Sequence, residues 1–169
     1  VVESFTQDPL CKAVERAVQS GIVVVVAAGN DGRVTEFGTD GYFMITSPGN
    51  DPFALTVGSM KTFHTPERDD DEIASYSSKG PSAIDHIVKP DLVAPGNYVG
   101  SVADGGTLRD SYGQNIVAKA FFDSRSNVGD KTPYFRLSGS SMSAAVASGA
   151  VAVLLDRYPS LTPDQVKAL

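Results

Sequence analysis

A run of five β-branched residues, Ile22–Val26, most constrains what this 169-residue chain can fold into. β-branched side chains lose freedom in a helix and pack well on a pleated surface, so the run predicts a strand. No polar residue alternates with the apolar ones. We therefore expect both faces of the strand to be buried, as in the centre of a parallel sheet.

A helical pattern precedes this strand in the sequence. Asp8 and Pro9 form a helix start, since they place a capping side chain before a proline at the first helical position. An apolar stripe at helical spacing follows, at Leu10, Ala13, Val14, Ala17 and Val18. Ser20 and Gly21 are expected to end this helix.

Three more strands are predicted further along the chain, at Phe53–Ser59, near Ile73–Tyr76, and within Lys89–Gly96. Strands that alternate with helices indicate an α/β protein with a parallel sheet flanked by helices. The connection over residues 97–136 exceeds the usual limit of about 12–15 residues for structureless loops. We expect it to carry elements of its own or to serve the functional site.

The last third of the chain predicts a helix over Ser141–Tyr158 that is apolar almost all round. Such a helix is expected to be buried, and its small residues allow other backbones to approach closely. Pro159 ends it. Thr162, Pro163 and Gln165 then provide a cap, a first-turn proline and a capping box for another helix.

The composition excludes some partners. The net charge is −6 and the sequence pI is about 4.8, which argues against binding to nucleic acid or an anionic membrane. No apolar run reaches the roughly 18 residues of a membrane span. The acidic run Asp69–Glu72 predicts a solvated loop, with a cation-binding loop as the alternative. The single cysteine, Cys11, is interpreted as a small buried helical residue rather than a nucleophile.

Two places carry candidate chemistry. One is Ala27-Ala28-Gly29-Asn30, at the carboxyl end of the first strand, where open α/β sheets bind ligands. Asn30 offers an amide donor there, although Gly-Asn is also a common turn pair. The other is Ser141, at the first turn of the terminal helix, where free N–H groups and the positive dipole end suit a developing oxyanion. Its alternative reading is a helix-capping serine.

Other templates fit poorly. A G-x-S-x-G nucleophile elbow would need glycine where Ser143 stands. No phosphate-binding glycine loop is present. His64 and His86, the two histidines, lack the spacing of a metal site.

Taken together, the segments GIVVVVAAGNDG, SYSSKGPS, KPDLVAPG and LSGSSMSAAVASGAVAVLL occur in an order that resembles the subtilisin-like serine proteases, the subtilases. The resemblance covers Pro9–Leu169 apart from the connection between Tyr98 and Tyr134. The most specific part is the serine box, in which a small-residue helix follows Gly-Ser-Ser-Met. The resemblance implies a subtilisin-like α/β fold and the hydrolysis of peptide bonds through an acyl-enzyme.

The resemblance also assigns roles. Ser141, the serine just before the methionine, matches the family nucleophile. Asn30 matches the amide of the oxyanion hole. Ala27, Ala28 and Gly29 match the strand-end residues that line one side of the pocket for the residue before the scissile bond.

This chain departs from the family in two respects. Ala145 stands where the serine box commonly has proline. The D-[ST]-G and H-G-T-H contexts of the other two triad members do not occur. We therefore expect residues 1–169 to be the C-terminal portion of one subtilase catalytic domain, with Asp and His supplied by sequence upstream. His64 and His86 are expected to be surface loop residues.

Several expectations follow from the resemblance. The substrate would be a polypeptide, the chemistry would need no metal or organic cofactor, and calcium would have at most a structural role with ligands that the sequence does not assign. The intact protein would be secreted or extracytoplasmic. The chain alone would be inactive and would self-associate through unpaired sheet edges. Two other hypotheses are a non-catalytic subtilase homologue with a binding or regulatory role, and an unrelated α/β binding protein.

Overall fold

The computed structural model describes residues 3–35, 38–102, 107–121, 123–125 and 134–169. The chain forms two compact units, one made of residues 1–97 and 139–169 and the other of residues 98–138. Each is described by itself. In the described part of the chain, no helix has the length and apolarity needed to cross a lipid bilayer.

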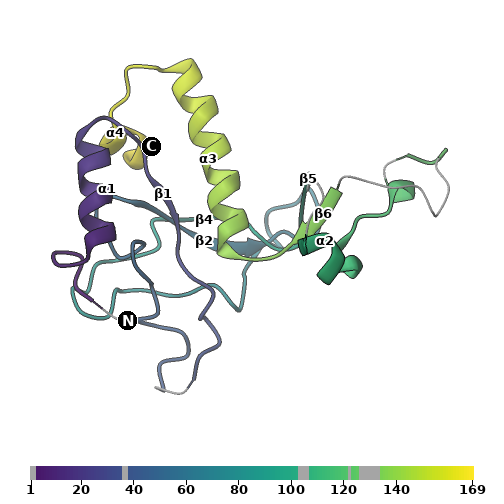
Figure 1. The fold of residues 1–169 in the computed structure, drawn as a ribbon, viewed down its shortest axis with the longest axis horizontal. Coiled ribbons are helices and arrows are strands. Elements are labelled where there is room, and N and C mark those ends of the chain that lie inside the picture. Colours follow the sequence, from purple (N-terminus) through teal and green to yellow (C-terminus); the bar gives the residue numbers. More distant parts are fainter. Residues whose placement is uncertain (1–2, 36–37, 103–106, 122, 126–133) are drawn as a thin grey trace. The chain divides into compact units, whose positions relative to one another are not determined.

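The first helix, α1 (Pro9–Gln19), begins as the sequence predicts (Figure 1). Asp8 is its N-cap, and the Asp8 carboxylate accepts a hydrogen bond of 2.7 Å from the backbone N–H of Leu10. The predicted apolar stripe is wrong at Leu10, which is 59% exposed, and at Ala13, which is also exposed. The buried positions are Cys11, Val14 and Val18. Val14 and Val18 pack with Ala54, and the Cys11 sulfur lies against Asn50.

The sheet of the first unit consists of β1 (Val25–Ala27), β2 (Leu55–Lys61), β3 (Glu72–Ile73) and β4 (Leu92–Pro95). β2 pairs in parallel with both β1 and β4, as the sequence predicts. β3 pairs antiparallel with the last two residues of β2. The carboxyl ends of β1, β2 and β4 therefore meet at one edge of the sheet.

The prediction for the β-branched run is wrong in two respects. The strand begins at Val25 rather than Ile22, and Ile22 is 57% exposed. It is also not central, since β2 is the only strand that pairs with β1 among the described residues. A run of apolar residues indicates that a strand is favoured in a buried environment. Its position in the sheet, central or at the edge, depends on which other strands are present. Self-association through this edge stays a prediction.

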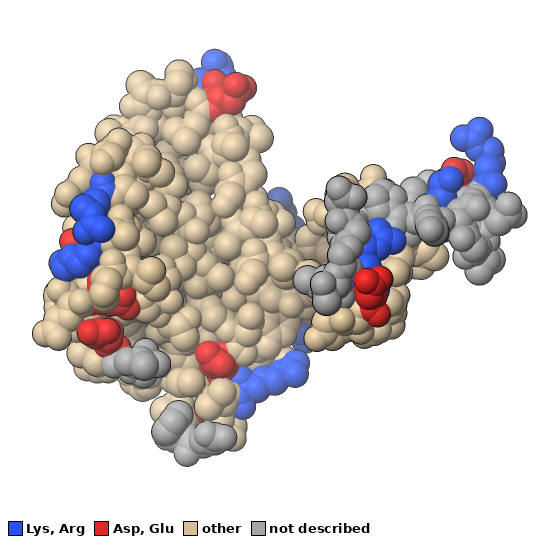
Figure 2. Space-filling model, viewed as in Figure 1, with Lys and Arg blue, Asp and Glu red and all other residues tan. Residues whose placement is uncertain are grey.

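The long helix α3 (Ser140–Arg157) matches the predicted span to within one residue at each end. It packs against β1, β2 and β4 through a cluster that contains Val57, Ala94 and Ala147. The expectation of burial all round is wrong, because Val153 is 72% exposed. Only one side of the helix has the sheet beside it. Charged side chains are nearly absent over β1 and α3 in Figure 2, where they lie mostly at the margins of the view.

A short helix, α4 (Pro163–Ala168), ends the first unit, with the predicted capping box between Thr162 and Gln165. The second unit contains β5 (Val99–Val102), β6 (Tyr134–Leu137), the helix α2 (Thr107–Ser111) and two short 3₁₀ turns, Gly113–Asn115 and Lys119–Phe121. β5 and β6 pair antiparallel. The long connection thus carries elements of its own, as predicted, although residues 103–106, 122 and 126–133 lie outside the described part.

The structure bears on two further predictions, those for Cys11 and for the acidic run Asp69–Glu72. Cys11 is fully buried, as predicted, and burial raises the pKa of its thiol to about 11, so the reactive thiolate is disfavoured near neutral pH. Asp69 and Asp70 are exposed, and Asp70 accepts a hydrogen bond from the Thr65 hydroxyl at 2.8 Å. Asp71 differs, since one of its carboxylate oxygens is buried without a hydrogen-bond partner among the described residues.

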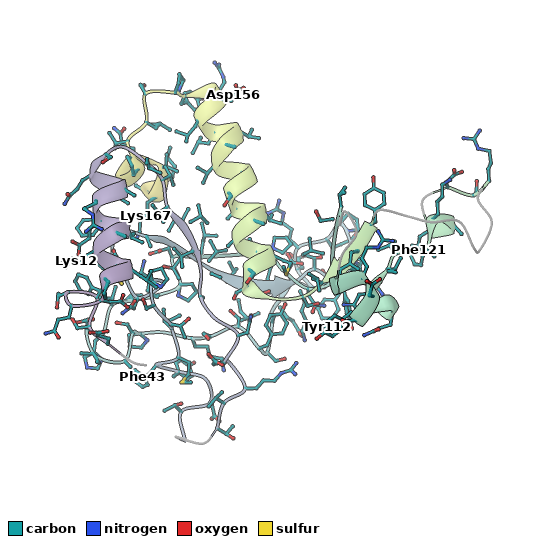
Figure 3. The ribbon with its side chains drawn as sticks, in the orientation of Figure 1. Lys12, Phe43, Tyr112, Phe121, Asp156 and Lys167 are labelled. Atoms are coloured by element: carbon teal, nitrogen blue, oxygen red, sulfur yellow. The ribbon has the colours of Figure 1, made fainter. Side chains whose placement is uncertain are left out.

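A buried ionic cluster joins β4 to α4. The Lys89 ammonium, almost fully buried, donates to the Asp91 carboxylate at 2.8 Å and to the carbonyl of Ala54 at 2.8 Å. Lys167, labelled in Figure 3, contacts the other Asp91 oxygen at 3.1 Å and donates to the carbonyls of Pro52 and Ala54. Burial is the main cause that lowers the pKa of Lys89 to about 8, and Asp91 opposes it.

This cluster predicts that Lys89 makes folding stability rise with pH in the alkaline range. An unfolded lysine titrates near about 10.4, so between pH 8 and that value the unfolded chain binds more protons at this site than the folded one. The raised pKa of the Cys11 thiol acts in the opposite direction over part of this range, so the test compares two variants. Replacing Lys89 by methionine should remove the Lys89 contribution while leaving Asp91 paired with Lys167. Urea midpoints at pH 7.5 and pH 10 measure it, with Lys12→Met on the surface of α1 as the control. A rise of equal size in both variants would contradict the prediction.

Candidate active site

The first half of the site is the turn that follows β1. The backbone N–H of Ala28 donates to the carbonyl of Val57 on β2 at 2.9 Å, and Ala28 is fully buried. Gly29 has a φ of +106°, and a Cβ there would lie 2.7 Å from the Ser78 hydroxyl and 3.2 Å from that of Thr46. Both the backbone angle and the lack of space therefore require glycine.

Asn30 follows Gly29 and is held by the start of α3. The Asn30 carbonyl oxygen, Oδ1, accepts hydrogen bonds from the Ser140 backbone N–H at 2.9 Å and from the Ser140 hydroxyl at 3.1 Å. These two bonds fix the orientation of the amide. The nitrogen, Nδ2, has no hydrogen-bond acceptor among the described residues, and it lies 3.5 Å from where a Cβ on Gly139 would stand. The amide is thus presented as a donor beside the first turn of the helix.

The second half of the site is the N-terminus of α3. Gly139 is the N-cap, and its carbonyl accepts from the N–H groups of Met142 at 3.0 Å and Ser143 at 3.4 Å. Ser141 is exposed at the second helical position. Its own N–H has no acceptor in the described chain, as is usual for the first turn of a helix. A free N–H and an exposed hydroxyl therefore occur on one residue at the positive end of an 18-residue helix.

Ser140 joins the two halves, and sequence reasoning missed it. It is fully buried, and its single hydroxyl proton is shared between the Asn30 Oδ1 and the Gly29 carbonyl, each at 3.1 Å. The hydroxyl oxygen accepts from the Gly29 N–H at 3.2 Å. With its two bonds to Asn30, it fastens the end of β1 to the start of α3. Its place immediately before Ser141 in the serine box was the signal for it. The structure thus brings Asn30 to the helix turn that carries Ser141.

The predicted pocket residues share this turn. Ala27 is the last residue of β1, and Ala27 and Gly29 are half-buried, whereas Ala28 is fully buried. A fully buried side chain contacts the core, so Ala27 and Gly29 are the two of this group that have surface to offer a substrate. Their role in binding stays a prediction.

The two histidines lie in loops and are exposed, as predicted. His64 follows β2, and the ring of His86 stacks edge-on with that of Phe43 at 6.3 Å between centroids. No histidine or carboxylate is hydrogen-bonded to Ser141 among the residues that the structure describes. The described residues also contain no group of three His, Cys, Asp or Glu side chains placed to hold a metal ion.

Comparisons with known proteins identify the family of the chain. The sequence model of the subtilase family matches residues 2–169. Serine protease AprX of Bacillus subtilis is 38% identical over 163 residues, which are 96% of this chain and 32% of AprX. Subtilisin E, also of Bacillus subtilis, is 29% identical over 154 residues, which are 91% of this chain and 29% of that protein. The chain thus spans about a third of the length of these relatives.

Solved structures show the same fold. A cold-adapted subtilisin-like serine proteinase matches with a TM-score of 0.58 and 27% identity, over 94% of this chain and 40% of the other. Sphericase matches with a TM-score of 0.60 and 23% identity, over 93% and 41%. The architecture is therefore part of a subtilisin-like α/β fold, and the chain belongs to the subtilase family.

Proposed function

We propose that this chain is the nucleophile-bearing, C-terminal portion of a subtilase peptidase domain, with Ser141 as nucleophile and Asn30 as oxyanion donor. The observation that carries the proposal is the Asn30 amide, whose Oδ1 is occupied by two bonds from Ser140. Because Asn30 Oδ1 is held in this way, Asn30 Nδ2 and the backbone N–H of Ser141 are left as two donors beside the exposed Ser141 hydroxyl. Such a pair suits the charge that develops on a carbonyl oxygen under attack.

The mechanism follows from these groups. The Ser141 hydroxyl attacks the carbonyl carbon of the peptide, and the oxygen that becomes negative accepts from Asn30 Nδ2 and the Ser141 N–H. A histidine takes the Ser141 proton and returns it to the leaving amine, and an aspartate orients that histidine. We place this histidine and aspartate in sequence that precedes Val1. After the amine has left, the histidine takes a proton from a water molecule, whose oxygen attacks the acyl carbon; the bond from that carbon to the Ser141 oxygen breaks, and the proton is returned to Ser141 as the acid leaves.

The remaining features of the proposal follow from the family. The substrate is a polypeptide, and the Ser-His-Asp chemistry uses protein groups alone. We propose a structural role for any calcium, without assigning ligands, and a secreted or extracytoplasmic location. The relative named serine protease AprX supports the general activity of a serine peptidase.

A second candidate is a non-catalytic subtilase homologue with a binding or regulatory role. The observation that favours it is that no base contacts Ser141 in the described residues. The arrangement of Asn30 favours the enzyme, because a binding module has no need of an amide donor that is fixed beside an exposed serine.

One experiment separates these candidates. The 169-residue chain and a longer polypeptide that includes the preceding sequence are assayed with a chromogenic peptide anilide. Without a base, Ser141 is an ordinary alcohol, so the short chain should show no turnover above background. The longer polypeptide should hydrolyse the anilide. Turnover by the short chain that Ser141→Ala abolishes would contradict the placement of the base, and an inactive but folded longer polypeptide would favour the non-catalytic homologue.

A further inference from the structure

The segment over residues 74–78, which contains the turn that follows β3, contacts both halves of the site. On one side, the Ser78 N–H donates to the Gly29 carbonyl at 3.0 Å, and the Ser78 hydroxyl accepts from the Asp31 N–H at 3.0 Å. The carbonyl of Tyr76 accepts from the Gly32 N–H at 2.9 Å. The backbone on both sides of Asn30 is thus fastened to this one segment.

On the other side, the Tyr76 side chain reaches the residue beneath the nucleophile turn. The Tyr76 hydroxyl donates to the Gly96 carbonyl at 2.8 Å. The same carbonyl accepts from the Gly139 N–H at 2.9 Å, and Gly139 caps the helix that carries Ser141. The Gly96 carbonyl oxygen therefore accepts hydrogen bonds from both the Tyr76 hydroxyl and the N-cap residue of α3.

Gly96 is closely packed and leaves no room for a side chain. A Cβ there would collide with the hydroxyl oxygens of Ser143 and Ser59 and would lie 2.8 Å from the Gly139 carbonyl oxygen. Gly96 also donates its own N–H to the carbonyl of Met60 at 3.1 Å. The end of β4 is therefore a close-packed floor under the turn, and a shift of Gly96 would be passed on to Gly139.

The hydrogen at the Tyr76 hydroxyl can be assigned. A phenol has one proton, and the Gly96 carbonyl can only accept, so this proton points to Gly96. The Ser59 hydroxyl, 2.9 Å from the Tyr76 oxygen, must then donate to it. Ser59 is fully buried at the carboxyl end of β2, so the sheet itself orients the tyrosine.

From these contacts we infer that Tyr76 is a positioning residue, which sets the place of the Ser141 turn relative to Asn30. Its carbonyl holds the loop of the oxyanion donor, and its hydroxyl holds the floor under the nucleophile. The inference rests on the proposed function of that site. Phenylalanine at this position would keep the ring and the backbone bond, and would lose both the tie to Gly96 and the bond from the Ser59 hydroxyl.

The test uses the longer polypeptide and two substrates, a peptide anilide and a peptide that extends by several residues beyond the scissile bond. Tyr76→Phe should lower kcat about tenfold for both substrates with KM unchanged, because the turn that carries Ser141 loses its tie through Gly96. A factor of ten in kcat is about 1.4 kcal/mol, the scale of one hydrogen bond. Tyr158→Phe, at the far end of α3, is the matched control and should leave kcat unchanged.

Each other outcome has a definite meaning. An unchanged kcat, or a rise in KM confined to the extended substrate, would overturn the inference, since the latter marks a contact with the leaving peptide. Ser59→Ala gives a second variant, and the double variant should lose no more kcat than Tyr76→Phe alone. Fully multiplicative losses would also overturn it. If Ser141→Ala still hydrolyses either substrate, the proposed function fails, and that result is separate from these.

Discussion

Replacing Ser141 by alanine in the longer polypeptide is expected to reduce turnover of a peptide anilide on the order of 10⁶-fold, the scale measured for subtilisin, a relative of this chain. Removing the hydroxyl leaves no group to form the acyl-enzyme, whereas the oxyanion donors remain. Ser141 is exposed and its hydroxyl has no partner among the described residues, so the fold should not change. Initial rates and a thermal unfolding curve measure the two effects.

Ser148 supplies the control for this variant, because it lies on the same helix and is also exposed. Its hydroxyl donates to the carbonyl of Ala144 at 2.7 Å and touches no residue of the site. Ser148→Ala should keep full turnover. If Ser141→Ala retained even a hundredth of the activity, another nucleophile would have to carry the reaction.

The second large effect is expected at Asn30, where loss of the amide donor should lower kcat by about 10²–10³, the range found for loss of an oxyanion-hole donor in subtilisin. KM should change little, because the bond to the oxygen strengthens only as negative charge develops. Alanine and aspartate are the informative replacements. Kinetics with the peptide anilide, with kcat and KM separated, measure the effect.

The Asn30→Asp variant separates the two roles of Asn30, donation to the oxyanion and the structural link to Ser140. Its carboxylate can still accept from the Ser140 N–H and hydroxyl, so the link between β1 and α3 is retained. It has no N–H to give to the oxyanion and adds a repelling charge. Asn30→Asp should therefore lose at least as much kcat as Asn30→Ala. Its unfolding temperature should be similar to that of Asn30→Ala or higher. Full activity of the aspartate variant would refute the assignment of Asn30.

Helix boundaries were predictable from the sequence because their signals are local. Asp8 and Pro9 begin α1, and Thr162 and Gln165 cap α4 through bonds between residues at most three apart. The chemistry of a cap depends on its own turn and not on the rest of the fold. The same applies to the serine box, whose four residues form one helix start.

The burial and contacts that could not be predicted from the sequence depend on residues far apart in the chain. Ile22 is apolar and yet exposed, and Val153 on α3 is more exposed still, because no described residue covers them. Tyr76 and Gly96, 20 residues apart, meet only when β2, β4 and the intervening loop are assembled. Both lie in segments that resemble the family, SYSSKGPS and KPDLVAPG, but a motif does not tell which atoms of it touch.

The measurement that tests the central claim most directly is covalent labelling of the longer polypeptide with a fluorophosphonate, followed by peptide mapping. An activated serine with an oxyanion hole reacts with such a probe, and an ordinary surface serine does not. The account predicts a single adduct on the peptide that contains Ser141, lost in Ser141→Ala and strongly slowed in Asn30→Asp. An active preparation whose adduct maps to any other residue would contradict it.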